Sequence, residues 1–288
     1  MATPNISFEF FPPQTLDASF RLWETAQVLA PLQPNFVSVT YGAGGTTRKL
    51  THEAVTTIGK NYGLNVAAHL TCVDATRAET KDIIDAYAEA GVTDIVALRG
   101  DAPKGATKFT PHPEGFASSV DLIEFLAEDG RFNIRCGAYP EPHPEATDAL
   151  ADVRFLKRKQ DAGATSAITQ FFFEADTFFR FRDACDKEGV TAKIIPGILP
   201  IQSWAGARRF AERCGTSVPT WVIEAFEAAQ RDGREELLAL SMCTELCDEL
   251  IRGGVEDLQF YTLNRPTLTR DVCHALGITP QARLEKVA

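Results

Sequence analysis

Residues 90–101 read Ala-Gly-Val-Thr-Asp-Ile-Val-Ala-Leu-Arg-Gly-Asp, and this stretch contains the unit from which the chain is built. Gly91 stands at the end of a segment with helical periodicity, where a glycine in the left-handed conformation closes a helix. The apolar run Asp94–Arg99 follows as a strand, and the strand ends in the polar group Arg99-Gly100-Asp101. The order is therefore a helix end, a strand and a polar strand end.

The same unit recurs along the chain. Apolar, β-rich runs alternate with segments that carry apolar residues at helical spacing, such as Ile84 and Ala88. The eight runs are Ser7–Phe10, Phe36–Tyr41, Asn65–Cys72, Asp94–Arg99, Asn133–Tyr139, Ser166–Phe173, Ala192–Leu199 and Asp257–Leu263. The glycines at helix ends are Gly63, Gly91, Gly163, Gly189 and Gly254. Several runs are almost continuously hydrophobic, which is typical of parallel strands covered by helices.

Eight alternations of strand and helix favour a closed (β/α)8 barrel of the TIM type over an open doubly wound sheet. A dinucleotide-binding sheet needs G-x-G-x-x-G after its first strand, and this chain has Phe-Phe-Pro-Pro there. With 288 residues, 44% of them hydrophobic, we expect a single catalytic domain over residues 1–288. The segment from about Pro219 to Gly253 is longer than one unit needs, so it predicts an extra helix before the last strand.

The composition argues against several kinds of partner. The net charge is −10, so neither nucleic acid nor an anionic membrane surface is an expected partner. No apolar stretch is long enough for a membrane span, and the N-terminus has no signal-peptide pattern. The seven cysteines contain no C-x-x-C pair, which indicates reduced structural thiols in a cytoplasmic protein and no metal site.

Polar residues at the ends of the runs are the candidates for function, because a barrel of this type builds its active site at the carboxyl ends of its strands. Glu9 lies inside an apolar strand, where burial would raise its pKa towards that of a general acid. A structural ion pair with an Arg or Lys is an equally good interpretation. Asp101 could similarly be only the salt-bridge partner of Arg99, and His69 is more often a core histidine than a catalytic one.

Two helical segments carry further candidates. Asp152, Arg158 and Lys159 follow His143 after the fifth strand, and their basic residues could hold a phosphate-bearing cofactor, although a solvated helix face is the default. Phe210 lies on the helix after the seventh strand, where aromatics are usually core. The chain contains no Ser-His-Asp order, phosphate-binding loop, HExxH or EF-hand spacing.

The chain resembles the bacterial methylenetetrahydrofolate reductase family over nearly its whole length, and the matching motifs occur in order. They are Ser7-Phe8-Glu9-Phe10-Phe11-Pro12-Pro13, Phe36-Val37-Ser38-Val39-Thr40-Tyr41-Gly42-Ala43, His69-Leu70-Thr71-Cys72, Ala97-Leu98-Arg99-Gly100-Asp101, Ala138-Tyr139-Pro140-Glu141, Leu156-Lys157-Arg158-Lys159, Ile168-Thr169-Gln170-Phe171-Phe172-Phe173, Pro196-Gly197-Ile198-Leu199-Pro200 and Phe260-Tyr261-Thr262-Leu263-Asn264-Arg265.

This resemblance implies a barrel that holds FAD and reduces 5,10-methylenetetrahydrofolate to 5-methyltetrahydrofolate, for methionine synthesis, with NADH or NADPH as the donor in a ping-pong order. Glu9 matches the general acid that helps to open the five-membered ring of the substrate. Asp101 matches a carboxylate near the flavin and the pterin. Its negative charge would disfavour an anionic reduced flavin and so make the flavin a stronger hydride donor.

The resemblance also assigns binding residues. Those implied for FAD are Thr40, Tyr41, Ala43, His69, Arg99, Gly100, Asp101, Ala117, Tyr139, His143, Asp152, Arg158 and Lys159. Those implied for the folate are Asp101, Gln170, Phe210, Tyr261 and Arg265. Arg265 is expected at the carboxylate-bearing end of the substrate, and Phe210 against the nicotinamide and the folate in turn.

The sequence departs from the family pattern at several positions. Phe155 stands where relatives can carry an Asn towards FAD, and Gly206 where they can offer a Gln to the folate. The loop Lys104–Gly115 is longer than in close relatives. The chain ends at Ala288, soon after the last barrel helix, so we expect no regulatory domain and no inhibition by S-adenosylmethionine. A homo-oligomer is implied by the resemblance only.

Two other functions remain open from the residues themselves. One is a non-flavin barrel lyase or isomerase that uses Glu9 as acid and base. Such an enzyme would need a Schiff-base lysine or a glycine-rich phosphate loop, and Pro196-Gly197-Ile198-Leu199-Pro200 supplies neither. The other is a folate-binding protein without catalysis, in which a buried Glu9 would have no chemical role.

Overall fold

The computed structural model describes residues 3–41, 48–101 and 109–280. Parallel strands in this part of the chain form one curved sheet. Its strands are β1 (Asn5–Phe10), β2 (Phe36–Val39), β3 (Val66–Thr71), β4 (Asp94–Leu98), β5 (Asn133–Ala138), β6 (Ser166–Thr169), β7 (Lys193–Ile195), β8 (Gly197–Ile198) and β9 (Asp257–Tyr261). Strands β1 to β7 pair with their neighbours in chain order, and β9 pairs with β1.

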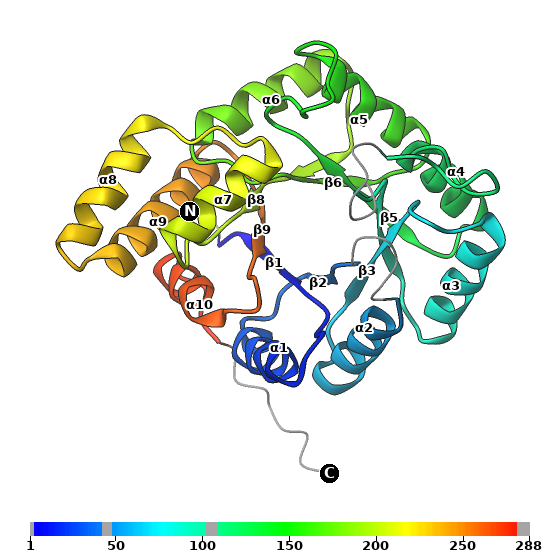
Figure 1. Cartoon of the computed structure of the whole chain (residues 1–288), viewed down its shortest axis with the longest axis horizontal. Helices are drawn as coiled ribbons and strands as arrows, with labels where there is room; N and C mark the ends of the chain where they lie inside the picture. Colours follow the sequence, from blue (N-terminus) through cyan, green and yellow to red (C-terminus); the bar gives the residue numbers. More distant parts are fainter. Residues whose placement is uncertain (1–2, 42–47, 102–108, 281–288) are drawn as a thin grey trace.

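Pro196 divides the seventh strand of the barrel. The run Ala192–Leu199 was expected as one strand, but β7 pairs with β6 and β8 pairs with β9. Proline has no N–H for a sheet ladder, while its carbonyl still accepts from the backbone N–H of Gln259 at 3.0 Å. The two halves therefore bridge β6 and β9, and the predicted (β/α)8 barrel is confirmed (Figure 1).

Helices surround the barrel (Figure 1). They are α1 (Leu16–Leu29), η1 (Ala30–Leu32), α2 (Arg48–Tyr62), α3 (Arg77–Glu89), α4 (Ser119–Asp129), α5 (Ala151–Asp161), α6 (Ala175–Lys187), α7 (Trp204–Cys214), α8 (Thr220–Arg231), α9 (Glu235–Arg252) and α10 (Pro266–Ala275). None of the helices in the described ranges is long and apolar enough to cross a membrane. All five glycines expected at helix ends have positive φ angles, from 63° at Gly63 to 122° at Gly163.

The extra helix expected before the last strand is present, and the segment Pro219–Gly253 contains two helices, α8 and α9. It is α9 that packs against α6 and α10 around the barrel. Helix α7 instead joins a separate cluster in which the Trp204 ring stacks on Phe226 with 4.6 Å between ring centroids. Helices α7 and α8 therefore stand apart from the ring of helices around the barrel, as an insertion before α9 (Figure 1).

Alternation along each strand decides which side chains enter the barrel. In β1, Ile6, Phe8 and Phe10 are buried in the main core that the helices cover, so Ser7 and Glu9 point the other way, into the barrel. The middle of the barrel is closed by a separate apolar cluster that contains Phe36, Val96 and Ile195. Polar groups above this cluster therefore face the carboxyl ends of the strands.

The amino-terminal end of the barrel is closed by a hydrogen-bonded carboxylate. Asp94 is buried and accepts from the side chains of Asn65, Asn133 and Arg135 at 2.7–3.0 Å. The Arg135 guanidinium also lies 3.9 Å from the centroid of the Phe36 ring. Burial would raise the pKa of Asp94, but hydrogen bonds from Asn133 and Asn65, together with the charge of Arg135, hold that pKa below its ordinary value. This end of the barrel is a stabilising network rather than a site.

Candidate active site

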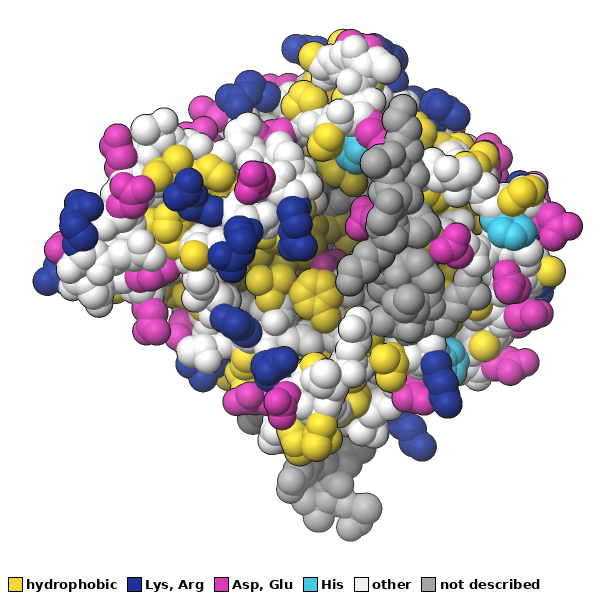
Figure 2. Space-filling view, in the orientation of Figure 1, with side chains coloured by type: hydrophobic (Ala, Val, Ile, Leu, Met, Phe, Trp, Pro, Cys, Tyr) yellow, Lys and Arg dark blue, Asp and Glu magenta, His cyan; other side chains and the backbone are white. Residues whose placement is uncertain are grey.

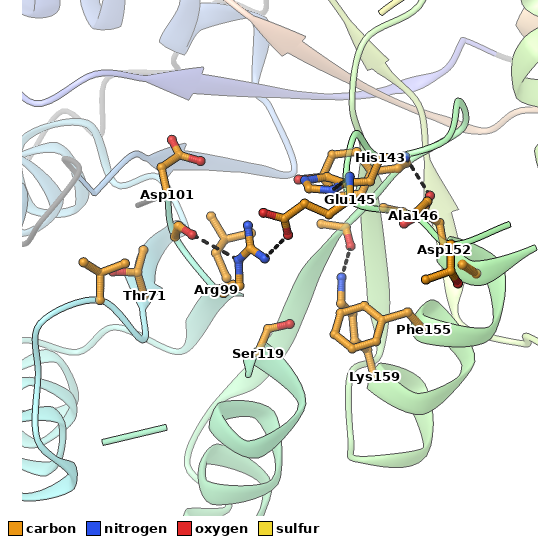
Figure 3. A pocket seen from close by; sticks show the side chains of 18 of the residues that line it. Thr71, Arg99, Asp101, Ser119, His143, Glu145, Ala146, Asp152, Phe155 and Lys159 are labelled. Carbon is orange, nitrogen blue, oxygen red and sulfur yellow. Dashed lines mark hydrogen bonds and ion pairs between the residues drawn. The ribbon is translucent and has the colours of Figure 1, made fainter. Parts of the chain in front are cut away.

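A cavity of about 440 Å³ opens at the carboxyl ends of β3, β4 and β5, beside the amino termini of α4 and α5. This volume is within the range of small-molecule sites. Eight residues that the sequence assigned to FAD line it together: Tyr41, Arg99, Gly100, Asp101, Tyr139, His143, Asp152 and Lys159. Figure 3 shows Arg99, Asp101, His143 and Lys159 arranged around one space. Strands that are neighbours in the barrel thus bring together residues from four different segments.

Arg99 is paired with a residue that the sequence did not indicate. Its Nη1 lies 2.5 Å from the Glu145 carboxylate, and its guanidinium lies 5.3 Å from the centroid of the Phe109 ring. Asp101 is exposed in the wall of the same cavity, and no ion pair joins it to Arg99 among the described residues. The interpretation of Asp101 as the salt-bridge partner of Arg99 was therefore wrong.

Lys159 supplies a buried cation to the cavity. Its Nζ donates to the Gly137 carbonyl at 2.7 Å and lies 4.8 Å from the centroid of the Phe155 ring (Figure 3). Burial lowers the pKa of Lys159, because water no longer solvates the ammonium group. Phe155 lines the cavity, and the exposed Arg158 places its guanidinium 5.4 Å from the same ring. The aromatic residue therefore contacts both neighbouring cations.

The wall formed by β5 and α5 is held by local contacts. The His143 ring packs edge-on against Tyr139 with 4.7 Å between centroids, and the backbone N–H of His143 donates to Asp152 at 2.8 Å. Burial, followed by the charge of Asp101, raises the pKa of Tyr139, so this phenol stays protonated. These contacts place the loop after β5 against the first turn of α5.

Glu9 faces His69 across the barrel mouth. The Glu9 Oε2 lies 3.5 Å from the His69 Nε2, and their side chains are 15% and 7% exposed. The His69 Nε2 is buried and has no hydrogen-bond partner within the described part of the chain. The predicted alternative of a pair between Glu9 and an Arg or Lys is therefore replaced by a pair with a histidine.

Burial favours the neutral form of both members of this pair. It raises the pKa of Glu9 to about 8 and lowers the pKa of His69 to about 3. At pH 7 the Glu9 carboxyl therefore carries a proton, and the unprotonated His69 nitrogen is available to accept a hydrogen bond from it. A protonated carboxyl at a barrel mouth has the property that a general acid needs.

The raised pKa predicts a pH dependence of stability. Between about pH 4.5 and pH 8 the folded protein keeps a proton on Glu9 that the unfolded chain releases, so the free energy of unfolding falls as the pH rises. Glu9→Gln removes this penalty. We expect the melting temperature of the variant, relative to wild type, to increase from pH 6.5 to pH 8.5; the titration of His69 in the unfolded chain is common to both proteins and cancels in this difference. Calorimetry across that range checks this, and a constant difference would refute it.

Tyr261 closes the opposite side of the mouth. Its hydroxyl donates to the Thr169 carbonyl at 2.6 Å, and the backbone N–H of Gly197 donates to the Thr169 hydroxyl at 2.9 Å. Burial, followed by the proximity of Glu9, raises the pKa of Tyr261. A Cβ on Gly197 would lie 2.5 Å from the Tyr261 ring and would also overlap the Thr169 carbonyl, so only glycine leaves room for this ring.

We expect Gly197→Ala to lower both stability and folate affinity, because the added methyl group must displace Tyr261. Overpacking of this kind typically costs about 1–3 kcal/mol. Gly206→Ala is the matched control, since a Cβ there would meet only Ser203 at 3.7 Å. Thermal unfolding and the KM for the folate, measured on both variants, test the expectation. Equal behaviour of the two would show that the close approach at Gly197 is unimportant.

The remaining folate candidates lie on this side of the mouth. The Phe210 ring stacks on Phe171 with 5.1 Å between centroids, and both belong to an apolar cluster that includes Tyr261. Gln170 follows β6 and is half-buried, whereas Arg265 is exposed at the amino terminus of α10. The cavity and the folate candidates thus occupy two parts of one barrel mouth. Tyr139, which lines the cavity, is close enough to Tyr261 to contribute to the rise in the Tyr261 pKa.

Some assigned FAD residues lie outside the cavity. Thr40, His69, Ala117 and Arg158 are not among its lining residues, and Ala43 lies outside the described residues, as does part of the loop Lys104–Gly115. The sequence also missed lining residues, among them Ser119, Gly137, Glu145 and Thr147. Position at a strand or helix end was the only signal for them. Glu145 lies in a loop whose course the periodicity does not define.

The lining of the cavity has the chemistry that a cofactor with a flat ring system and phosphate groups needs. Leu98, Gly137 and Ala138 provide an apolar surface for a flat ring system. Two cations, Arg99 and Lys159, lie beside this surface, and the first turns of α4 and α5 border it. Cations and helix amino termini both favour phosphate groups. Within the described ranges, no group of three or more His, Cys, Asp or Glu is placed to hold a metal ion.

Sequence comparison finds one family. A family model described as methylenetetrahydrofolate reductase matches residues 1–277. The 5,10-methylenetetrahydrofolate reductase of Salmonella typhimurium is 45% identical over 277 residues, which cover 96% of this chain and 92% of that protein. The enzyme of Escherichia coli K12 is 44% identical with the same coverage. A probable methylenetetrahydrofolate reductase (NADH) from Oryza sativa subsp. japonica is 33% identical, over 97% of this chain and 49% of that protein.

Structural comparison finds solved proteins of similar fold. An uncharacterized protein from Clostridium thermocellum that binds two copies of 5-methyl-5,6,7,8-tetrahydrofolic acid has a TM-score of 0.62 at 13% identity, with 96% of this chain and 95% of that chain covered. A Yersinia pestis DHPS with a pterine-sulfa conjugate has a TM-score of 0.51 at 12% identity, with 96% and 93% covered. At such identities these likenesses establish the fold alone.

Proposed function

Because this chain belongs to the methylenetetrahydrofolate reductase family and is an oxidoreductase that acts on 5,10-methylenetetrahydrofolate, we propose that it uses FAD to carry hydride from NADH or NADPH to this substrate. The product would be 5-methyltetrahydrofolate, a methyl donor for methionine synthesis. Membership of a reductase family supports this proposal over the two alternatives left open by the residues, a non-flavin lyase or isomerase and a binding protein without catalysis.

The observation that carries the proposal is the burial of the Glu9 carboxyl at the mouth of the barrel, 3.5 Å from the His69 Nε2. The Glu9 pKa of about 8 keeps the proton in place at neutral pH, and its neighbour His69 is neutral. Glu9 donates this proton to a nitrogen of the five-membered ring of the substrate. That ring then opens to an iminium ion, whose methylene carbon accepts hydride. His69 lies beside the carboxyl and adds no positive charge that would favour loss of its proton.

The cavity residues support FAD as the cofactor. Lys159 and Arg99 are the cations for its phosphates, and Asp101, Tyr139 and His143 line the same cavity. Arg158 and Phe155 extend this surface along α5. Bound FAD supplies a two-electron carrier that accepts hydride from a nicotinamide and donates it to a folate. The protein residues bind and orient it and exclude water from the apolar wall.

The other side of the mouth supports folate binding. Phe210 and Tyr261 offer aromatic surface, Gln170 an amide and Arg265 a positive charge for the carboxylate-bearing end of the substrate. Gly206 gives no side chain to this side, so the folate is held without a contact from that position of α7. The two substrates use this surface in turn, which is the basis of the proposed ping-pong order.

The experiment that tests the proposal is the visible spectrum of the purified protein under anaerobic conditions. We expect a flavin band that bleaches on addition of NADH or NADPH and returns on addition of methylenetetrahydrofolate. A colourless protein that stays colourless after incubation with FAD would overturn the cofactor. A bleached band that the folate does not restore would overturn the acceptor.

Asp101→Asn tests the electrostatic role of the cavity wall. Removal of a negative charge beside the flavin should raise the reduction potential and slow hydride delivery to the folate. A dye-equilibration measurement of the potential, together with the rate of flavin reoxidation by the folate, checks this. Glu128→Gln removes an exposed carboxylate near the end of α4 that lies away from the cavity, and it serves as the matched control. An unchanged potential in Asp101→Asn would contradict the assignment.

Two further features belong to the proposal. We expect the protein to work in the cytoplasm, because its substrates and cofactors are there, and to form a homo-oligomer, as the resemblance implies. Size-exclusion chromatography with light scattering tests the second expectation directly.

A further inference from the structure

The turn that ends β9 has a strained backbone. Leu263 and Asn264 both have φ angles of 52°, and the backbone N–H of Arg265 donates across them to the Thr262 carbonyl at 2.9 Å. Positive φ at both central residues is the arrangement of a type I′ turn, which glycine, asparagine and aspartate favour. A leucine keeps this backbone only where its surroundings hold it, and strain of this kind clusters at functional sites. The contacts that hold the turn are therefore informative.

The Asn264 side chain holds the first residue beyond β1. Its oxygen accepts from the backbone N–H of Phe11 at 3.0 Å, and its nitrogen donates to the Phe11 carbonyl at 2.9 Å. Asn264 is 7% exposed, so water competes little for these hydrogen bonds. The amide thus continues the pairing of β1 with β9 past the ends of both strands.

The segment that follows β1 has few groups of its own with which to fix its position. Pro12 and Pro13 have no N–H, so that of Phe11 is the single backbone donor in these three residues. The Phe11 ring is exposed and anchors the segment weakly. Figure 2 shows that the barrel mouth is a hollow on this face of the molecule. A strand end beside a hollow is not packed on every side, so the two hydrogen bonds from Asn264 matter for its position.

Thr262 connects the same turn to Glu9. Its hydroxyl donates to the Glu9 carbonyl at 2.6 Å and accepts from the backbone N–H of Asn264 at 3.2 Å. The backbone N–H of Thr262 donates to the same Glu9 carbonyl at 3.3 Å. Thr262 is buried, so its hydroxyl is shielded from water. Two side chains of one turn therefore hold β1 at Glu9 and at Phe11, and we call Thr262 and Asn264 the β9 clamp.

We propose that the β9 clamp positions Glu9 for proton transfer to the substrate. This inference rests on the proposed function, in which Glu9 is the general acid. Proton transfer needs a donor and an acceptor about 2.6–3.2 Å apart, and a misplacement of about 1 Å can cost about 100-fold in rate. Thr262 and Asn264 supply no proton, and they act through the backbone of β1. The same turn leads directly into Arg265, so it also fixes the start of α10 relative to the acid.

Thr262→Val and Thr262→Ser are a matched pair that tests the hydroxyl. Valine has the shape of threonine without the hydroxyl, whereas serine keeps it. With saturating methylenetetrahydrofolate, we expect the rate constant of flavin reoxidation per bound flavin to fall about tenfold in Thr262→Val and to stay within about twofold in Thr262→Ser. Flavin reduction by NADH or NADPH should keep its rate in both variants, because that half-reaction does not use Glu9 as an acid.

Asn264→Gly tests the amide, because glycine adopts a φ angle of 52° without strain and has no side chain. We expect flavin reoxidation to slow by about 10-fold to 100-fold, again with unchanged flavin reduction. Gln33→Gly is the control, since Gln33 is exposed and has the same φ angle at the end of η1. It should leave both half-reactions unchanged. Circular dichroism and flavin content show whether each variant is folded and loaded.

The pH profile of flavin reoxidation separates positioning from a general loss of structure. The wild-type rate should fall as the pH rises through about 8, the pKa that burial gives Glu9. His69 on β3 and Tyr261 on β9, the titratable groups that face Glu9 within the described ranges, are both neutral at that pH. Loss of the clamp lets water reach the carboxyl, so the midpoint should move to lower pH in Thr262→Val and in Asn264→Gly.

Three results would overturn the clamp. They are wild-type rates of reoxidation in both variants, equal slowing of the two half-reactions, and slower reoxidation with an unmoved pH midpoint, which would mean that the turn acts on a group other than Glu9. Each of these leaves the proposed function intact. Wild-type protein whose reduced flavin is not reoxidised by the folate would instead overturn the proposed function.

Discussion

Glu9→Gln is expected to abolish reduction of the folate while leaving reduction of the flavin by NADH or NADPH nearly intact. The amide keeps the size of the side chain and its hydrogen-bonding capacity, but it has no acidic proton to give to the substrate nitrogen. Loss of a general acid typically lowers a rate by about 10²–10⁴-fold. Stopped-flow absorbance of the flavin band, recorded separately for each half-reaction, measures both rates on the same sample.

The contrast between the two half-reactions makes this prediction informative. Glu9 and His69 form a buried neutral pair, so the substitution could also disturb the mouth through packing. If both half-reactions fell together, Glu9 would be a structural residue. His69→Gln is the matched variant, since it keeps the Glu9 proton and changes only its neighbour. We expect it to slow the folate half-reaction much less than Glu9→Gln.

Asp94→Ala is expected to destabilise the protein by about 3–5 kcal/mol, because it leaves Arg135 charged and unpaired at the closed end of the barrel. It also removes the acceptor of hydrogen bonds from Asn65 and Asn133. Urea unfolding at pH 7 measures the loss. The pKa of Asp94 is held below its ordinary value, so this carboxylate stabilises the folded protein at neutral pH. Its contribution to the free energy of unfolding is lost as the pH falls from the ordinary pKa of an aspartate through the lowered pKa of Asp94.

Two further variants separate burial from charge. Asp85→Ala removes a carboxylate from an exposed salt bridge with Arg131 and should change stability little. The double variant Asp94→Ala/Arg135→Met removes the unpaired charge along with its partner, and it should recover part of the loss. If Asp94→Ala were as mild as Asp85→Ala, the network at the amino-terminal end would not be a stabilising element.

Much of the fold follows from local sequence. Each expected helix end at Gly63, Gly91 and Gly163 adopts the left-handed backbone that glycine permits, because this preference depends on one residue and its neighbours. The division of the seventh strand at Pro196 was not predicted, although the proline is plain in the sequence. Whether a proline interrupts a strand depends on which neighbouring strand would need its missing N–H, and that is a property of the assembled sheet.

The site was predicted less completely. Glu9 was noticed because a carboxylate in an apolar strand is unusual, yet its partner His69 is distant in sequence and belongs to another strand. The pairing of Arg99 with Glu145 and the close approach of Gly197 to Tyr261 likewise join segments that no periodicity connects. Such contacts arise from the register and closure of the barrel, which sequence spacing does not encode.

The sequence by itself determined the barrel, the face on which function lies, and the resemblance that names the chemistry. These depend on hydrophobic periodicity, on strand-end residues and on long motifs, all of which are local in the chain. The tertiary structure alone decided the burial of Glu9 beside His69, the partner of Arg99 and the close approach of Gly197 to Tyr261. The physical reason is that desolvation, ion pairing and close packing depend on which atoms exclude water from one another, and in this protein those atoms come from strands and helices far apart in the chain.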